Sequence, residues 1–309
     1  MMFQFRPNPT CISRHQQVLM RLVIVFFCSI SLFFSLSHAQ SFHLTTPRVA
    51  AMGSAGIGGA QANSALVLNP AGMSAGAFYA VDANYFRTSE KANLLGINVV
   101  DSQTRYTRDR FALGLGYQGR IQDGEATAHD AQIGFSRPAS KIGNMLLLLG
   151  GSARYIYDEI SQRDNFDINI GAMLQLSSLV SLGIVGAELL DDSHRKVGSG
   201  IAVTTKQIAI NLDYLRYLET KQDQYRAGAE FMVSDSLVFR GGYLYGKQAN
   251  SNSMSNNLNS TIKQWSIGLA FVGLGGGDGQ LSLSYSEQVD TEHSFFGLSL
   301  ATYLRMGEN

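Results

Sequence analysis

From Phe78 onward the chain repeats one pattern, a run of about ten residues in which large apolar side chains alternate with small or polar ones. In one such run, Tyr225 and Phe231 share a face, while Arg226 and Glu230 share the opposite face. Successive side chains of a β-strand point to opposite faces, so each run predicts a strand with one apolar face. No convincing amphipathic helix follows Gly76, and the chain is therefore predicted to be all-β.

The length and number of these runs separate a membrane barrel from a soluble sheet. Ten residues at a tilt of about 45° match a bilayer core of about 30 Å, whereas strands of globular proteins average about 5–6 residues. Fourteen runs are recognisable, and tight turns such as 177–178 alternate with longer links such as 247–260. The runs begin near Phe78, Asn93, Arg110, His129, Asn144, Asn165, Leu179, Gly198, Gln207, Gln224, Ser236, Thr261, Gly279 and His293.

Even strand numbers, short turns and longer external loops are typical of bacterial outer-membrane barrels. Because no water in the hydrocarbon core can satisfy an open sheet edge, a spanning sheet has to close. We therefore expect a transmembrane antiparallel β-barrel over residues 78–306, with fourteen strands. Twelve strands is the alternative, since the runs at 93–100 and around 199–210 are the weakest.

The first 39 residues have the pattern of a signal peptide. Arg21 precedes an apolar run at 22–36, which ends in Ser37-His38-Ala39, a plausible cleavage site. We expect Sec-type export and a location in the outer membrane of a Gram-negative-type cell. Met20 directly precedes Arg21, so a start at Met20, with 1–19 as an upstream over-extension, is an alternative interpretation.

Composition argues against several other classes of protein. Cys11 and Cys28 both precede the expected cleavage site, so the mature chain would have no disulfide and no cysteine ligand. Removing 1–39 takes three arginines from the 24 basic residues and leaves 21 against 24 acidic ones, a balance that does not favour nucleic-acid binding. The histidines lack metal-ligand spacing, and no cofactor, metal or enzyme activity is expected.

Residues 40–77 differ in kind from the rest of the chain. Small residues dominate 50–60, and Asn69-Pro70-Ala71-Gly72-Met73 follows. So many small residues would pack poorly against lipid, but they can lie close to surrounding backbone inside a narrow lumen. A short helix is expected at 63–68, ended by the proline. We therefore expect 40–77 to form an N-terminal hatch inside the barrel.

Five segments carry a resemblance to a known family: Arg48-x-Ala50-Ala51-Met52-Gly53, Ala65-Leu66-x-x-Asn69-Pro70-Ala71-Gly72-Met73, Leu212-Asp213, Ala227-Gly228-Ala229-Glu230-Phe231 and Phe239-Arg240-Gly241-Gly242-Tyr243. In this order they resemble the hatch and the C-terminal strands of the FadL/TodX-type outer-membrane transporters, whose relatives include the PorV/PorQ-type barrels. The chain differs from that family at Gln61 and Asn63, where acidic residues are usual, and in its shorter external loops.

The resemblance implies passive uptake of small hydrophobic molecules, such as fatty acids, through the outer membrane. It also implies that Asn69, Pro70 and Ala71 line the passage that opens when the hatch shifts. A rigid turn within the hatch is the alternative role of these three residues, and the two roles overlap. The alternative is a non-transporting, PorV-like scaffold that binds other proteins, which the short loops favour. The expected partners are outer-membrane lipid and hydrophobic small molecules, with a protein partner under the alternative and no nucleic acid under either.

The alternation also predicts which charged side chains face the lumen. If Tyr225 and Phe231 face lipid, then Arg226 and Glu230 point inward, and the same parity places Asp213 and Arg240 inward. We expect these four residues to form a lumen polar network that fills the barrel and holds the hatch. Direct contact with a permeant is the alternative role.

Overall fold

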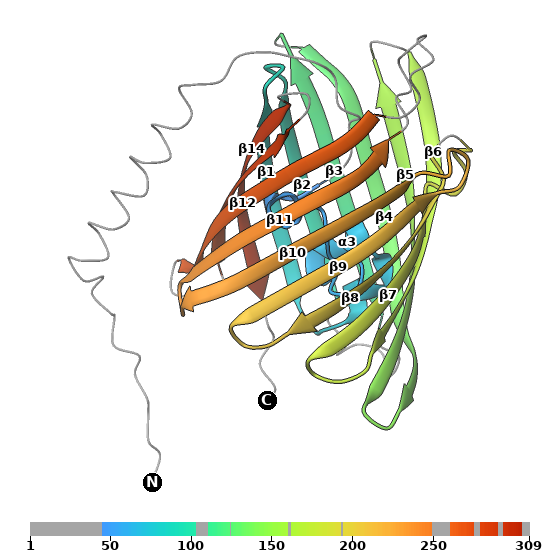
Figure 1. Cartoon of the computed structure of the whole chain (residues 1–309), viewed down its shortest axis with the longest axis vertical. Helices are drawn as coiled ribbons and strands as arrows, with labels where there is room; N and C mark the ends of the chain where they lie inside the picture. Colours follow the sequence, from blue (N-terminus) through green and yellow to red (C-terminus); the bar gives the residue numbers. More distant parts are fainter. Residues whose placement is uncertain are drawn as a thin grey trace, which may run out of the picture. The chain divides into compact units, whose positions relative to one another are not determined.

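The computed structural model describes residues 45–102, 111–123, 125–159, 162–192, 194–248, 260–274, 279–289 and 293–304. Fourteen antiparallel strands form a closed barrel in which each strand pairs with its sequence neighbour and β14 pairs with β1 (Figure 1). The predicted fold class and the larger strand number are confirmed. The expected signal peptide, 1–39, lies outside the described residues.

The strands cover nearly all of the chain from residue 79 to 304. They are β1 (Tyr79–Thr88), β2 (Asn93–Asp101), β3 (Ala112–Gln122), β4 (Glu125–Ile142), β5 (Met145–Asp158), β6 (Arg163–Gln175), β7 (Val180–Ala187), β8 (Lys196–Thr204), β9 (Ile208–Tyr217), β10 (Asp223–Ser234), β11 (Leu237–Gln248), β12 (Ser260–Leu274), β13 (Gly279–Gln288) and β14 (Ser294–Leu304). β4 begins earlier than the run expected from His129, because Glu125 already pairs with Gln122 of β3 in a tight hairpin. The intervening residues lack large apolar side chains, so the alternation is not visible there.

The connections between strands lie at two ends of the barrel. The loop end contains the link 188–195, and β11 ends and β12 begins at the same end, as the alternation predicts. The turn end contains short links such as 143–144 and 205–207, together with the start of β1 and the end of β14. One link at the turn end, 102–111, is longer than the pattern of tight turns predicts.

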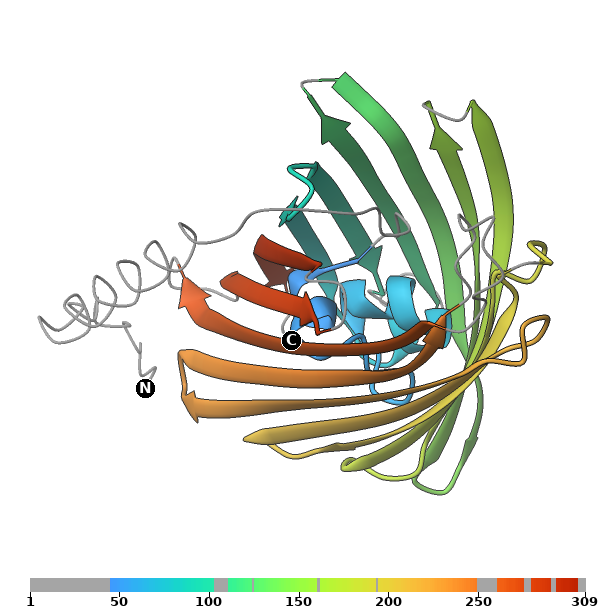
Figure 2. The same cartoon turned by 45° about the horizontal axis from the view of Figure 1, so that its top comes forward.

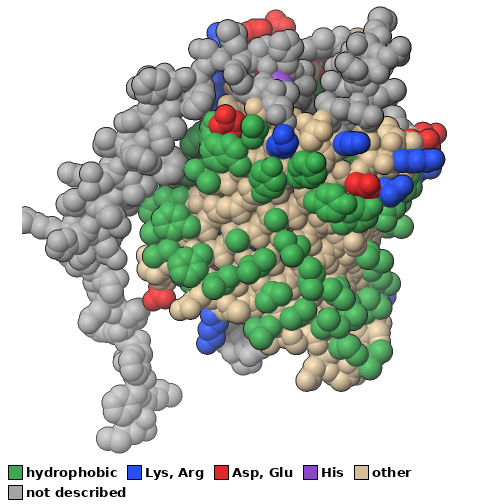
Figure 3. Space-filling model, viewed as in Figure 1, with side chains coloured by type: hydrophobic (Ala, Val, Ile, Leu, Met, Phe, Trp, Pro, Cys, Tyr) green, Lys and Arg blue, Asp and Glu red, His purple; other side chains and the backbone are tan. Residues whose placement is uncertain are grey.

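The outer wall is apolar and the inner wall carries the polar groups. Tyr225, Phe231 and Phe239 point outward and are about half exposed, whereas Asp213 and Arg240 point inward and are buried. Figure 3 shows hydrophobic side chains spread over the outer wall, with charged side chains gathered mainly toward its upper margin. This is the surface that a transmembrane barrel presents to lipid.

Residues 45–77, the lumenal segment, form α2 (Pro47–Ala51), α3 (Ala62–Leu68) and the 3-10 helix η1 (Pro70–Ser74). The Thr46 side chain begins α2 by accepting a hydrogen bond from the N–H of Val49. α3 matches the helix expected at 63–68 and ends before Pro70. Among the described residues, no helix is long and apolar enough to cross a membrane.

The lumenal segment packs against the inner wall of the barrel (Figure 2). α2 contacts β11 to β14, and η1 contacts β3 to β6 on another part of the wall. A Cβ atom on Gly150, Gly171 or Gly242 would lie 2.6, 2.0 or 2.1 Å from atoms of the lumenal segment. Glycine at these positions therefore lets the backbone of the segment approach the backbone of the wall.

Ile267 in the middle of β12 points outward and is 48% exposed. A substitution there tests whether this wall faces lipid. Ile267→Arg should lower the free energy of unfolding by about 2–4 kcal/mol, because a cation on the lipid face near the bilayer midplane is poorly solvated. Urea titration of protein folded into lipid vesicles measures this change. Ile267→Leu is the matched control, and equal stabilities of the two variants would contradict the assignment.

Candidate functional site

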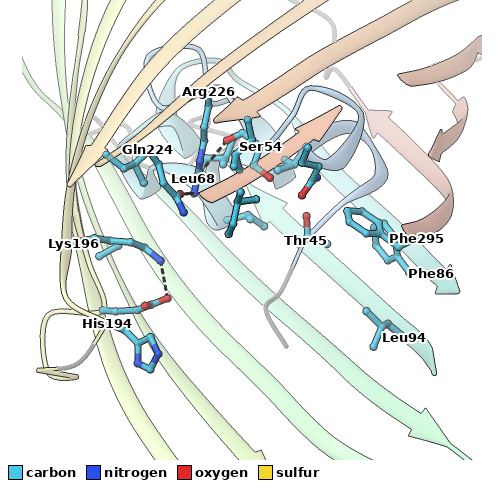
Figure 4. Close-up of a pocket in the computed structure, with 18 of the residues that line it drawn as sticks. Thr45, Ser54, Leu68, Phe86, Leu94, His194, Lys196, Gln224, Arg226 and Phe295 are labelled. Atoms are coloured by element: carbon cyan, nitrogen blue, oxygen red, sulfur yellow. Dashed lines mark hydrogen bonds and ion pairs between the residues drawn. The ribbon is translucent and has the colours of Figure 1, made fainter. Parts of the chain in front are cut away.

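A cavity of about 320 Å³ lies in the lumen, between the lumenal segment and the loop end of the barrel (Figure 4). Its floor includes Leu66, Val67 and Leu68 of α3, together with Pro70. This part of the floor is apolar and belongs to the lumenal segment, which also lines the cavity with Thr45 and Ser54.

The two sides of the cavity differ in character. Figure 4 shows Phe86, Phe295 and Leu94 on one side and Lys196 and His194 on the other. The rings of Phe86 and Phe295 pack edge to face with centroids 6.1 Å apart, a favourable aromatic geometry. Arg120, which is opposite Leu94 in the strand register, and Glu90 also line the cavity near these apolar side chains. The cavity therefore offers apolar surface bordered by charged groups.

The charged side of the cavity is held by ion pairs within the wall. Nε of Arg154 donates to Oδ1 of Asp130 at 2.9 Å, and a second nitrogen of Arg154 lies 3.5 Å from the Glu188 carboxylate. Nζ of Lys196 lies 3.0 Å from the same carboxylate and 5.5 Å from the ring centre of Tyr217. Buried charges need such partners, and the pairing offsets the cost of placing these charges beside an apolar floor.

The predicted passage residues lie where the lumenal segment meets β6 and β7. Asn69 is fully buried, and its side-chain nitrogen donates to the carbonyl oxygens of Ile57 at 3.0 Å and Ala172 at 3.2 Å. Its side-chain oxygen accepts the N–H of Ala71 at 3.2 Å and so begins η1. Pro70 lines the cavity, whereas Ala71 is buried beneath the floor. A role of these residues in passage stays a prediction.

Two of the four predicted network residues bind the backbone of the lumenal segment directly. The carboxylate of Asp213 accepts the N–H groups of Gly56 at 2.7 Å and Ile57 at 3.0 Å. The guanidinium of Arg226 donates to the carbonyl oxygen of Ser54 at 3.2 Å. The turn after α2 is therefore tied to β9 and β10.

The other two network residues form an ion cluster with α2. Oε2 of Glu230 lies 2.6 Å from Nε of Arg240 and 3.2 Å from Nε of Arg48. Arg48 also donates to the hydroxyl of Ser64 in α3 at 3.3 Å. The cluster thus joins α2 and α3 to the wall, and its contribution to function stays a prediction.

Asp167 and Asn169 also point inward, but they hold a different element. Asp167 accepts the N–H of Leu190 at 3.0 Å, and Asn169 accepts the N–H of Glu188 at 2.9 Å. These bonds fix the link between β7 and β8 at the loop end.

Several wall residues that hold the lumenal segment were not singled out from the sequence. The hydroxyl of Ser136 donates to the carbonyl of Ala71 and lies 2.7 Å from the hydroxyl of Ser74. The amide of Gln132 donates to the carbonyl of Leu66 at 2.8 Å. Strand parity places Ser136 and Gln132 on the inward face, but it carries no information about which carbonyl lies opposite.

The fit between Asn69 and β6 generates a test of how the segment is held. Gly171→Ala would place a Cβ atom 2.0 Å from the side-chain oxygen of Asn69. Such overpacking costs about 1–3 kcal/mol and should loosen η1, raising the exchange of buried positions by about five- to a hundredfold. Maleimide labelling of an Ala71→Cys variant measures that exchange, since the natural cysteines, Cys11 and Cys28, both lie outside the barrel and the lumenal segment in sequence.

Gly151→Ala on the neighbouring strand is the matched control, because its Cβ would meet no atom closer than 3.5 Å. Equal labelling rates in the Gly171→Ala and Gly151→Ala backgrounds would show that the contact with Asn69 does not hold the segment.

No protein-family model and no curated protein matches the chain. Solved structures match at low identity. TbuX, a toluene transporter from Ralstonia pickettii, is 13% identical with a TM-score of 0.59, over 85% of this chain and 98% of its own. TodX, a toluene transporter from Pseudomonas putida, is 13% identical with a TM-score of 0.57 over the same shares.

A third match, CymD, is described as a monoaromatic hydrocarbon channel. It is 15% identical to this chain, with a TM-score of 0.56, over 85% of this chain and 98% of its own. Identities this low establish a likeness of fold. The chain therefore has the fold of the TodX-type, FadL-like barrels, as its sequence motifs predict.

Proposed function

We propose that the chain is an outer-membrane barrel for the passive uptake of small hydrophobic molecules. The observation that carries this proposal is the cavity at the loop end, whose apolar floor belongs to the lumenal segment and not to the wall. The likeness of fold to toluene transporters and to a monoaromatic hydrocarbon channel supports it.

Passage requires the lumenal segment to move. Leu66 of the floor and Met73 beneath it pack with Leu148 and Met173 of the wall, and all four side chains are at most 2% exposed. A ligand resting on α3 can advance only when η1 leaves its place against β5 and β6. Asn69, Pro70 and Ala71 would then border the opened path. The driving force is the concentration gradient of the ligand, and the polar anchors would return the segment to its place.

The size of the cavity favours a small ligand. Sites for drug-sized molecules enclose about 300–1,000 Å³, and this cavity of about 320 Å³ lies at the lower limit. A single aromatic ring fits such a space better than an extended fatty acid. We therefore place monoaromatic compounds before fatty acids as the substrate class, and both are probes in the test below.

The hydroxyls of Ser74 on η1 and Ser136 on β4 are 2.7 Å apart, which suits a removable disulfide between segment and wall. The double variant Ser74→Cys/Ser136→Cys, when oxidised, should lower cellular uptake of radiolabelled toluene and oleate to the level of cells without the protein. Reduction should restore it. Each single cysteine variant is the matched control for the substitution itself.

Two results would contradict this proposal at different points. Undiminished uptake through the oxidised double variant would show that movement of the lumenal segment is not required. Uptake by cells with the unmodified protein no faster than by cells without it would remove the transport function.

A second function, a scaffold that binds another protein without transport, is favoured by the close packing of the lumenal segment against the inner wall. Asp213 and Asn69 anchor the segment to three strands, and inner-wall glycines leave no room between the two backbones. Under this alternative, protein extracted from native outer membranes in mild detergent retains a second polypeptide at fixed ratio. Under transport, mass spectrometry of the same preparation finds a hydrophobic compound instead.

A further inference from the structure

The outer wall over β2 to β6 contains a hollow that is a different feature from the cavity in the lumen. It has a volume of about 490 Å³ and is open toward the outside of the barrel. Apolar side chains line it almost entirely, among them Leu115, Tyr117, Ile133, Tyr155 and Phe166. These side chains point outward and are about half exposed, so the hollow belongs to the surface that faces lipid.

Two alanines in a belt of large side chains form the bottom of the hollow. Ala131 of β4 lies between Tyr117 of β3 and Tyr155 of β5 in the strand register. Ala153 of β5 lies directly beside Ile133 in the next row toward the turn end. Because a methyl group leaves space where its neighbours carry rings and branched chains, the two positions join into one depression.

A rigid polar cluster closes the hollow toward the loop end. The hydroxyl of Tyr117 is 2.7 Å from Nδ1 of His129, and Nε2 of His129 is 3.1 Å from the carboxylate of Glu159. The ring of His129 stacks between those of Tyr117 and Tyr157, with centroids 6.1 and 6.5 Å apart. These contacts fix the Tyr117 ring, and the hollow beside it is therefore preformed.

Glycine at position 119 allows this arrangement. Gly119 is opposite His129 in the register, and a Cβ atom there would lie 3.3 Å from the hydroxyl of Tyr117. The Tyr117 side chain leans over Gly119 toward the loop end, where it reaches His129. That lean moves the ring away from Ala131 and widens the hollow.

The hollow is separate from the lumen. The ladders between β2 and β3, β3 and β4, β4 and β5, and β5 and β6 are all paired along the rows that form it. A molecule in the hollow therefore touches the outer face of a closed sheet, and a ligand in the lumenal cavity has no path to it through these ladders. The occupant comes from the membrane.

We propose that this hollow is a binding site for one membrane lipid, with an acyl chain over Ala131 and Ala153 and the headgroup at the Tyr117–His129–Glu159 cluster. A void on a lipid-facing wall forfeits dispersion contacts unless an acyl chain fills it. Rigid aromatic walls lower the ordering cost for that chain, as preorganised sites do. The site thus distinguishes one bound lipid from the fluid lipids around the rest of the barrel.

The charges near the cluster select the headgroup. Glu159 and Asp164, which is opposite Tyr157 in the register, both carry carboxylates on the outward face. A headgroup that bears an amine complements these groups, whereas a purely anionic headgroup is opposed by them. The row of His129 and Tyr157 lies four residues from the row of Ile133 and Ala153, about 13 Å along the strand, which places the headgroup toward the loop end and the chain toward the turn end.

The test is native mass spectrometry of delipidated, detergent-solubilised protein to which dipalmitoyl phosphatidylethanolamine is added back. The unmodified protein should carry one tightly held lipid. Ala131→Leu/Ala153→Leu fills the hollow and should lower the bound fraction at a limiting lipid concentration about tenfold, because the added side chains occupy the place of the chain. If the double variant does not fold, the same measurement is made on the single variant Ala153→Leu.

Ala229→Leu on β10, also an outward alanine, is the matched control and should bind as the unmodified protein does. Tyr117→Phe/Glu159→Gln should weaken retention of the amine-bearing lipid and reduce its advantage over dipalmitoyl phosphatidylglycerol. Equal binding by the hollow-filled and control variants would overturn the proposal. So would retention of toluene in place of lipid at the hollow, which would indicate a lateral ligand site.

Discussion

The structure depends on the close contact between the backbone of the lumenal segment and the inner wall of the barrel. Short helices and turns leave many N–H and carbonyl groups without partners in their own segment, and such groups are costly when buried. The wall supplies those partners from inward positions, as Asp213 does for Gly56 and Ile57. Glycines such as Gly171 and Gly242 provide the space that this approach requires.

These contacts determine where free space remains. The segment fills the lumen on the side of η1 and the Met73–Leu148 core, so the open volume lies above α3 at the loop end. The same residues therefore close the barrel and form the floor of its cavity. Polar anchors such as Asp213 and Asn69 hold the segment in this place.

The outer wall follows a different principle. Its large apolar side chains face the hydrocarbon core of the membrane, which makes no hydrogen bonds. Small residues among these side chains create depressions of defined shape. The hollow over Ala131 and Ala153 lies beside the stacked rings of Tyr117, His129 and Tyr157. Inner and outer faces of β3 to β5 thus offer two separate sites, divided by a single hydrogen-bonded sheet.

The sequence alone determined the barrel, the inward parity of Asp213, Arg226, Glu230 and Arg240, and the helix before Pro70, because these follow from local periodicity and backbone chemistry. It favoured fourteen strands and left twelve open, and the closed barrel of the structure decided between them. Only the tertiary structure decided their partners. Closure and register bring Arg48 to Glu230 across 182 residues and Ser136 to Ser74, and no local pattern encodes such distances. The cavity and the hollow arise in the same way, since each exists only where several strands meet.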